Sequence, residues 1–304
     1  MTRLRYDLCG KVVLITGGTG GIGSATAREL LGRGAKVAIV DVDPETPRIA
    51  ARMSSHSAMG SIADVRDRDA LDVAVADVVD RFGRVDVAIA NAGILARAET
   101  LRNTPTPSIE SVLAVNVSGV VNTVQAAMDE VIAHRGQFVL ISSVFAFLNG
   151  MGTIPYAMSK AAVEQLGRGL RVELAAHGVS TTIAYFSLIE TNMIKHGVDG
   201  DPVVEELLAT LPRPLLKRLQ PSTAATALAN SLAHRSPRIM EPSRWKPISA
   251  LRGLIVPALD SHLTRNRRTL AALSALDARS HTALSQPTIP MSLRGRTFKL
   301  KGMK

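Results

Sequence analysis

The 304 residues of the chain, 46% of them hydrophobic, are enough to bury one large core. The single cysteine, Cys9, excludes a disulfide within the chain and suits a reducing compartment. No apolar run resembles a signal peptide or is long enough to span a membrane, so we expect a cytoplasmic protein. The formal net charge of +10 is concentrated in residues 241–304, which hold 12 Lys and Arg against 3 Asp and Glu.

The first predicted elements are a strand, a glycine-rich turn and a helix. Residues 11–16 are an apolar, β-branched run typical of a buried parallel strand, and residues 21–33 have a helical pattern. Between them, Thr16-Gly-Gly-Thr-Gly-Gly-Ile-Gly23 fits the G-x-G-x-x-G pattern of dinucleotide-binding turns. Glycines there let the backbone approach a pyrophosphate at the helix N-terminus.

Asp41 ends the next predicted strand, residues 36–41, and lies 18 residues after Gly23. An acid at this place can bind both hydroxyls of the adenosine ribose and would repel a 2′-phosphate. No Arg or Lys follows in residues 42–44. The sequence therefore favours NAD(H) over NADP(H). The alternative is that Asp41 is a solvated acid at a strand end.

The rest of the body alternates strands and helices. Strands are expected at 58–64, 85–90, 137–142 and 179–185, and helices at 68–82, 105–134 and 155–177. This alternation predicts an α/β fold, a Rossmann-like doubly wound parallel β-sheet flanked by helices. We expect one NAD(P)-binding catalytic domain, residues 1–240, followed by a basic amphipathic C-terminal extension, residues 241–304.

Tyr156 and Lys160 are four residues apart in a predicted helix, so their side chains lie on the same helix face. An ammonium beside a phenol would lower the pKa of the tyrosine from its ordinary value of about 10. Such a tyrosine would be a usable general acid or base near neutral pH. A Tyr and a Lys at this spacing occur by chance in many helices. Their order and distance relative to the glycine turn support a catalytic interpretation.

Over about residues 8–235 these motifs resemble the classical short-chain dehydrogenase/reductase family. The resemblance rests on the glycine motif, on Asp64-Val65, on Asn91-Ala-Gly93, on Asn116, on Ser143 lying 13 residues before Tyr156, and on Thr191. It implies four catalytic residues, Asn116, Ser143, Tyr156 and Lys160. It also implies these cofactor-binding residues: Gly17, Thr19, Gly21, Ile22, Gly23, Asp41, Asp64, Val65, Asn91, Ala92, Gly93, Tyr156, Lys160, Ile189 and Thr191.

The resemblance also implies the role of each catalytic residue. Tyr156 exchanges a proton with the substrate oxygen, while Lys160 lowers the pKa of Tyr156 and binds the nicotinamide ribose. Ser143 hydrogen-bonds the substrate oxygen, and Asn116 anchors a water that links Lys160 to solvent. Two alternatives stay open: Ser142 is the functional hydroxyl, or Asn116 merely caps or kinks its helix. No His, Cys and carboxylate cluster has metal-ligand spacing, so we expect no metal.

The sequence departs from the family in two places. Phe186-Ser187 stands where a Pro-Gly pair normally follows the sixth strand, and a Phe there could pack on the nicotinamide or narrow the substrate site. The usual short last strand with its closing glycines is not apparent, and the basic extension replaces it.

Two segments after the catalytic motifs have no assigned role in the chemistry. Residues 191–220 are interpreted as a substrate lid with an apolar face formed by Leu207, Leu208 and Leu211, or else as an ordinary surface helix. The extension mixes apolar and basic residues from Trp245 to Leu259, followed by Arg265-Asn-Arg-Arg268. It is interpreted as an interfacial membrane segment, or as a helical cover over the substrate pocket or an oligomer contact.

These observations lead to a functional hypothesis. We expect an NAD(H)-dependent alcohol dehydrogenase or ketone reductase that acts on a hydrophobic secondary alcohol or ketone. The alternatives are an NADP(H)-dependent 3-oxoacyl-thioester reductase and a non-catalytic dinucleotide-binding scaffold recruited to membranes. The resemblance implies a homo-oligomer, a dimer or tetramer. Nucleic acid is an unlikely partner because aromatic residues make up only 3% of the chain.

Overall fold

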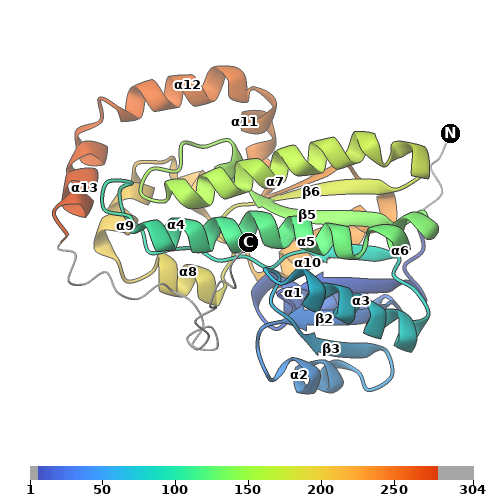
Figure 1. Ribbon diagram of the computed structural model, residues 1–304. Coiled ribbons are helices and arrows are strands. Elements are labelled where there is room, and N and C mark those ends of the chain that lie inside the picture. Colours follow the sequence, from blue (N-terminus) through green and yellow to red (C-terminus); the bar gives the residue numbers. More distant parts are fainter. Residues whose placement is uncertain (1–5, 280–304) are drawn as a thin grey trace, which may run out of the picture.

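The strands form one parallel sheet in a computed structural model, which describes residues 6–279 (Figure 1). Within these residues the sheet has seven strands in the order β3-β2-β1-β4-β5-β6-β7. Every neighbouring pair is parallel, so the predicted Rossmann-like doubly wound sheet is confirmed. The strands are β1 (Val12–Thr16), β2 (Lys36–Asp41), β3 (Ala58–Ile62), β4 (Val87–Ala90), β5 (Gln137–Ser143), β6 (Ser180–Phe186) and β7 (Arg238–Glu241).

Helices cover both faces of the sheet (Figure 1). One face carries α1 (Gly21–Gly32), α2 (Thr46–Met53) and α10 (Pro221–His234). The other face carries α3 (Arg68–Phe82), α5 (Gly119–Ala126) and α7 (Ile154–Glu173). The remaining helices are α4 (Thr106–Leu113), α6 (Met128–Ala133), α8 (Asn192–Gly197), α9 (Pro202–Ala209), α11 (Lys246–Ala250), α12 (Arg252–Leu263) and α13 (Arg267–Asp277).

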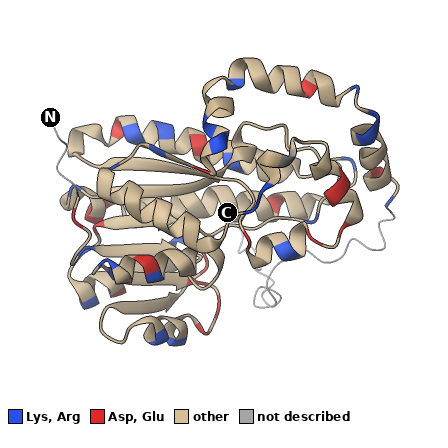
Figure 2. Ribbon diagram, turned by 180° about the vertical axis from the view of Figure 1, so that it is seen from behind, with Lys and Arg blue, Asp and Glu red and all other residues tan. Residues whose placement is uncertain are grey.

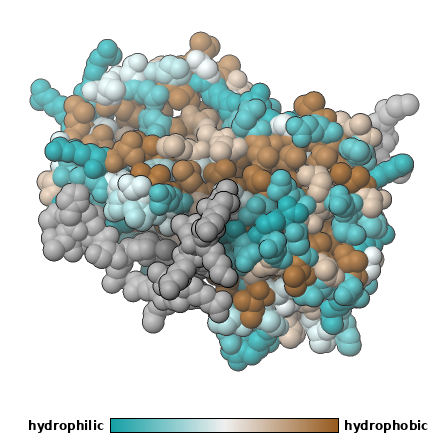
Figure 3. Space-filling view, viewed as in Figure 1, coloured by the Kyte–Doolittle hydropathy of each residue, from teal (hydrophilic) through white to brown (hydrophobic). Residues whose placement is uncertain are grey.

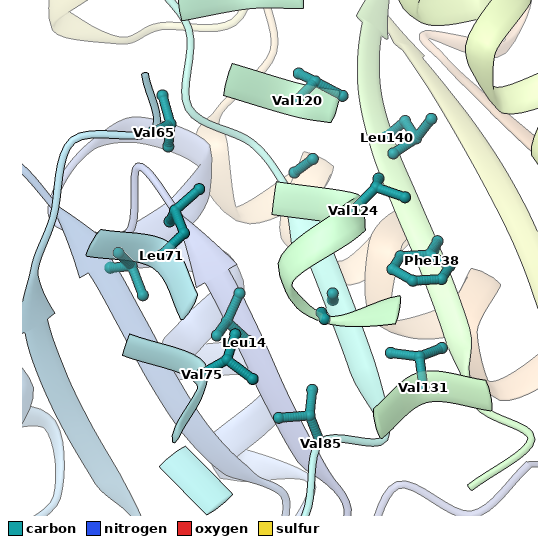
Figure 4. Packing of buried hydrophobic residues seen from close by; sticks show 14 of the residues in the cluster. Leu14, Val65, Leu71, Val75, Val85, Val120, Val124, Val131, Phe138 and Leu140 are labelled. Carbon is teal, nitrogen blue, oxygen red and sulfur yellow. The ribbon is translucent and has the colours of Figure 1, made fainter. Parts of the chain in front are cut away.

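Strand side chains alternate between the two layers of helices. Leu14 of β1 belongs to the core under α3 and α5, where it lies beside Val75 of α3 (Figure 4). Its neighbour Ile15 belongs to the core under α1 and α10. Both side chains are at most 1% exposed. Because each face of the sheet is buried, the strands need apolar residues at successive positions, which explains the unbroken apolar runs.

The predicted helix 105–134 is not continuous. α4 leads into a π-helical segment, Ala114–Ser118, and then into α5, and Ala127 separates α5 from α6 at φ −92° and ψ 1°. A π turn adds one residue to the helix and is frequent at functional sites. The insertion cannot be recognised from the apolar periodicity. One added residue shifts the apolar positions around the helix axis but does not interrupt their repeat.

The expectation that a last strand is missing was wrong. β7 lies beside β6 in parallel register, and Phe186 pairs with Glu241. Ile239 and Met240 in its centre are buried, while its first residue is exposed. A strand of four residues with charged residues at both ends gives little periodic signal, and the closing glycines are absent from the sequence.

The C-terminal extension forms a helical arm, residues 246–279, built from α11, α12 and α13. In Figure 1 it arches beside the end of the sheet that carries the carboxyl ends of the strands, and Figure 2 marks the positions of its Lys and Arg residues in blue. Residues 280–304 of the predicted extension lie outside the described residues. Among residues 6–279 there is no helix that combines the length and the apolar character needed to cross a membrane.

Apolar side chains gather on the outer face of α7. Figure 3 shows them along this helix, where Met158 is 52% and Val172 is 77% exposed. The predicted homo-oligomer would involve this face, because the resemblance assigns subunit contacts to the helices on this side. It stays a prediction.

Gly167 sets the distance between α7 and the sheet. A Cβ atom at Gly167 would lie 2.6 Å from Cγ1 of Ile183 in β6, whereas a Cβ atom at Gly169 of the same helix would meet nothing within 4 Å. We expect Gly167→Ala to destabilise the protein by about 1–3 kcal/mol through overpacking. Gly169→Ala should stabilise it by about 0.5–1 kcal/mol, because alanine favours the helix.

Urea unfolding of both variants measures the difference. Equal stabilities would show that α7 does not press on β6 at this position.

Candidate active site

Two hollows meet at the carboxyl ends of the strands. One is a polar cleft of about 400 Å³ between the glycine turn and the ends of β2, β4 and β5. The other is an apolar cavity of about 110 Å³ under α8 and α9. Tyr156 lines both hollows, and Ser143 lines only the cavity.

The predicted cofactor-binding residues are brought together in the cleft. All of them line it except Gly23, which lies behind the turn. The sequence did not point to several further residues that line the cleft: Val40, Val42, Ala63, Ile94, Val115, Ile141, Asn192, Met193 and Ile194. Most of these are apolar or follow a strand end, and their side-chain types give no signal of a binding role.

The glycine turn is packed too closely to admit side chains. A Cβ atom at Gly23 would lie 2.2 Å from the carbonyl oxygen of Gly17, and Gly17 itself has φ +66°. Gly20 precedes α1 without a side-chain cap, and the first turn of α1 has no acidic residue. The positive end of a 12-residue helix with free amide groups therefore lies at the cleft, an arrangement that favours an anion.

Asp41 is held at the rim of the cleft by the turn. Its carboxylate accepts hydrogen bonds from the backbone N–H of Thr19 at 3.1 Å and from the Thr19 hydroxyl at 2.7 Å. Asp64, the other cleft acid among the predicted residues, is paired with Arg66. Burial raises the pKa of Asp64, whereas the hydrogen bonds and the charge of Arg66 lower it. The lowering effects together are larger, so the pKa lies below its ordinary value.

Asn91 ties the end of β4 to the glycine turn. Its Nδ2 donates to the carbonyl oxygens of Thr16 at 3.0 Å and Gly17 at 2.9 Å, and its backbone N–H donates to the Thr16 hydroxyl at 3.2 Å. Asn91 therefore holds the glycine turn, which lies between β1 and α1, against the end of β4.

The two candidate serines have different surroundings. The Ser143 hydroxyl donates to the carbonyl oxygen of Phe186 at 3.1 Å and is a hydrogen-bond partner of the Tyr156 hydroxyl. The Ser142 hydroxyl donates to the carbonyl oxygen of Lys160 at 2.9 Å and does not line the cavity. The geometry favours Ser143 as the serine that faces a substrate.

Lys160 lies inside the protein, beside Tyr156. Its Nζ donates to the carbonyl oxygen of Ile141 at 3.0 Å and lies 5.4 Å from the centre of the Tyr156 ring. Burial lowers the pKa of Lys160 from 10.5 to about 8. Burial raises the pKa of Tyr156 to about 12, against the lowering effect of its hydrogen bond with Ser143. The predicted direction for the pKa of Tyr156 was therefore wrong, because the effect of burial outweighs that of the hydrogen bond with Ser143, and Lys160 is not among the groups that shift this pKa.

Asn116 lies in the π segment and is fully buried. Its Oδ1 accepts from the backbone N–H of Ile94 at 2.8 Å, and its Nδ2 donates to the carbonyl oxygen of Ile94 at 2.9 Å and to Ser159 at 3.1 Å. The side chain thus holds the segment that follows Gly93. The position of Asn116 in a π turn agrees with the alternative of a kinked helix, and its water-anchoring role stays a prediction.

Phe186 continues β6 where the family has its Pro-Gly pair. It pairs with Ser143 on one side and Glu241 on the other, and the Ser187 N–H donates to the carbonyl oxygen of Glu241 at 3.0 Å. The Phe186 side chain is 3% exposed, packs in the core under α1 and α10, and lines the cleft rather than the cavity. Phe186-Ser187 therefore extends the strand pairing of the sheet, and the Phe186 side chain does not narrow the cavity.

The apolar cavity is covered by the predicted lid. Leu207 and Leu208 of α9, with Leu211 after it, line the cavity as their apolar face suggested. Leu259 and Leu263 of the arm line it as well, which agrees with the interpretation of the extension as a cover. None of the described residues that line the cavity is charged.

Comparisons with known proteins identify the family of the chain. A sequence model described as short chain dehydrogenase matches residues 11–201. The chain is 32% identical over 210 residues to 2-(R)-hydroxypropyl-CoM dehydrogenase of Xanthobacter autotrophicus, covering 67% of this chain and 84% of that protein. It is 35% identical over 177 residues to cis-2,3-dihydrobiphenyl-2,3-diol dehydrogenase of Paraburkholderia xenovorans, covering 56% and 63%.

A solved structure shares the fold. The 3-ketoacyl-(acyl-carrier-protein) reductase from Brucella melitensis, complexed with NADH, superposes with a TM-score of 0.68 at 23% identity. The match covers 77% of this chain and 97% of the reductase.

The three tyrosines of the chain, Tyr6, Tyr156 and Tyr185, all have a pKa raised to about 12, chiefly by burial. In a rapid pH jump, phenolate absorbance of the folded protein should rise near pH 12, and that of the urea-unfolded chain near pH 10. Because the unfolded state releases these protons first, stability should fall as pH rises from about 10 to 12.

Tyr156→Phe should remove one of the three equal steps in absorbance. A phenol of the folded protein that ionises below pH 10 and disappears in this variant would contradict the burial of Tyr156.

Proposed function

The chain belongs to the short-chain dehydrogenase family, and we propose that it transfers a hydride between NAD(H) and an apolar secondary alcohol or the matching ketone. The observation that carries the proposal is the place of Tyr156, at the boundary between the polar cleft and the apolar cavity. A proton donor at this boundary serves a substrate in one hollow and a dinucleotide in the other.

The cleft offers groups suited to each part of a dinucleotide. The amides at the start of α1 would hold the diphosphate, and Asp41 the adenosine ribose. Lys160 would bind the nicotinamide ribose, and Ile189 and Thr191 would contact the nicotinamide end. The bound nicotinamide supplies or accepts the hydride.

The charge of the cleft supports NAD(H) rather than NADP(H). Arg66 neutralises Asp64, so Asp41 contributes the unneutralised carboxylate at the rim, where a 2′-phosphate would meet it. Thr19 fixes this carboxylate through two hydrogen bonds, which keeps it from rotating away.

Tyr156 and Ser143 carry the proton chemistry. With a pKa near 12, the Tyr156 hydroxyl is protonated at neutral pH and can donate its proton to a ketone oxygen. Ser143 is hydrogen-bonded to Tyr156 and faces the same cavity, so its hydroxyl can stabilise charge on that oxygen. In the reverse direction, Tyr156 would accept the alcohol proton.

Lys160 and Asn116 support this proton transfer. The Lys160 ammonium, with its pKa near 8, is the cation nearest to Tyr156 in the helix and would favour the phenolate when the proton leaves. A Cβ atom at Gly93 would lie 3.3 Å from Oδ1 of Asn116 and 3.6 Å from Nζ of Lys160. The absence of a side chain at Gly93 therefore leaves room for Asn116 and Lys160 beside it.

The cavity indicates the substrate class. Its lining is aliphatic and aromatic apart from a few hydroxyls and Asn149, and none of the described lining residues is charged. An anionic group bound there would lose water without gaining a cationic partner among the described lining residues. The cavity thus favours a neutral, apolar ketone or alcohol. The NADP(H)-dependent thioester reductase is less favoured because it requires the cofactor that Asp41 disfavours.

We expect Tyr156→Phe to lower turnover of a methyl ketone by about 10²–10⁴-fold, because it removes the proton donor. NADH binding, followed by fluorescence, should be retained. Tyr185→Phe is the matched control, since it removes the same atom from a buried tyrosine that lines neither hollow and should leave turnover intact.

Two results would count against the enzyme. Turnover of Tyr156→Phe equal to that of Tyr185→Phe would remove Tyr156 from the chemistry. A wild-type chain that binds NADH but turns over no ketone in a broad panel would favour the scaffold alternative.

We expect the wild-type protein to bind NADH more tightly than NADPH, and Asp41→Ala to reduce this preference by about tenfold, or 1.4 kcal/mol. Fluorescence titration with both nucleotides measures it. Asp43→Ala is the control, because Asp43 lies two residues further along the chain and does not line the cleft. Tighter binding of NADPH by the wild type would overturn the assignment of Asp41.

A further inference from the structure

The helical arm contributes a wall of the substrate cavity. Leu259 and Leu263 of α12 line the cavity together with Leu207 and Leu208 of the lid. Leu263 is 4% exposed, although it ends a helix on the outside of the sheet. The arm lies beyond residues 11–201, the part of the chain that the family model matches.

The start of the arm is anchored to the body. Trp245, directly before α11, is 2% exposed and packs edge to face against Phe147 with 6.3 Å between ring centres. Arg252 forms an ion pair of 2.7 Å with Glu164 of α7, whose side chain is 8% exposed. A charge pair with one buried partner resists opening, because separation would leave Glu164 buried without its cation.

The centre of α12 is fixed at the rim of the cavity. Asn149, which itself lines the cavity, donates from Nδ2 to Oδ1 of Asp260 at 2.7 Å. Asp260 stands between Leu259 and Leu263, so this bond sets how far the two leucines lie from the body. The opposite face of α12 is open to solvent, and Leu254 on it is 76% exposed.

The end of the arm is joined to the lid. Leu276 of α13 is fully buried and packs in one cluster with Leu207 of α9. Arg279 forms an ion pair of 2.5 Å with Asp201, and Asp201 also caps α9 by accepting from the N–H of Val203 at 3.1 Å. Figure 1 shows α13 beside α9. Arm and lid therefore cover the cavity as one unit.

A buried amide adds a third attachment. Asn103 is 7% exposed, and its Nδ2 donates to the carbonyl oxygens of Leu276 at 3.3 Å and Asp277 at 2.9 Å. These carbonyls belong to the last turn of α13, where the regular backbone hydrogen bonds of the helix end. The end of the arm is thus bound through both its side chains and its backbone.

We propose that the arm is part of the substrate site, and that Leu259 and Leu263 determine the length of the apolar chain that the site accepts. The inference rests on the proposed function, because the ligand is taken to be an apolar ketone. Replacing either leucine by a smaller residue opens the cavity wall that the arm forms. Ketones with longer alkyl chains then gain room, and ketones with shorter alkyl chains lose contacts.

The test measures binding without turnover. Affinities of a series of unbranched methyl ketones of increasing length are measured by calorimetry in the Tyr156→Phe background saturated with NADH. The wall variants are Leu259→Ala, Leu263→Ala and the opposite change Leu259→Phe. Leu254→Ala is the matched control, since it makes the same change on the exposed side of the same helix. Unfolding midpoints show whether each variant folds.

We expect the alanine variants to favour long over short ketones by about tenfold or more relative to the control. Leu259→Phe should shift the preference to shorter ketones. Because Leu259 is only half-buried, variants at this position still test the proposal if Leu263→Ala does not fold. Wall variants that behave like Leu254→Ala, or a parent chain that binds no ketone of the series, would overturn the proposal. Ketones that bind with the expected preference but are never reduced by the wild type would contradict the proposed function alone.

Discussion

The close packing of α7 onto β5 and β6 is the contact on which the site depends. Gly167 lets the helix lie against Ile183, and two hydrogen bonds then join the helix to the end of β5. Ser142 donates to the carbonyl of Lys160, and Lys160 donates to the carbonyl of Ile141. A helix lying a further ångström from the sheet would break both bonds and would move Tyr156 away from Ser143. The chemistry of the site is therefore a consequence of backbone packing as much as of side-chain type.

This packing has an electrostatic cost. Burial lowers the pKa of Lys160 to about 8 and raises that of Tyr156 to about 12, so each group is less easily charged than in water. For Lys160, the folded state releases its proton first, and the cost of burying the ammonium is therefore fully present below pH 8 and declines as pH rises to about 10.5. Such local conflicts between burial and charge are expected where a site needs a reactive group.

The parts of the structure with strong local signals could be predicted from the sequence. Apolar β-branched runs located the buried strands, and the glycine turn located the start of α1, because both patterns follow from backbone geometry. The break of helix 105–134 and strand β7 could not be predicted in this way. A π turn changes the pattern by one residue, and β7 depends on pairing with Phe186 rather than on its own four residues.

The candidate site shows the same division. The residues from Gly17 to Thr191 lie near strand ends, so topology alone brings them to one edge of the sheet. The direction of the pKa of Tyr156 depends on water loss in three dimensions, which residue spacing does not reveal. The arm offered two interpretations because an amphipathic helix can bury its apolar face against a membrane or against protein. The contact of Leu276 with Leu207 shows that part of the apolar face packs against protein, while membrane contact stays a prediction.

The sequence positions of the residues that line the two hollows have a consequence for synthesis on the ribosome. Every residue that lines the polar cleft has been made once Ile194 is added, whereas the apolar cavity lacks part of its wall until Leu263. The nascent protein thus possesses every residue that lines the polar cleft well before it has every residue that lines the apolar cavity. Because chains fold progressively from the N-terminus, nucleotide present during translation could stabilise the body while the cover is still being synthesised.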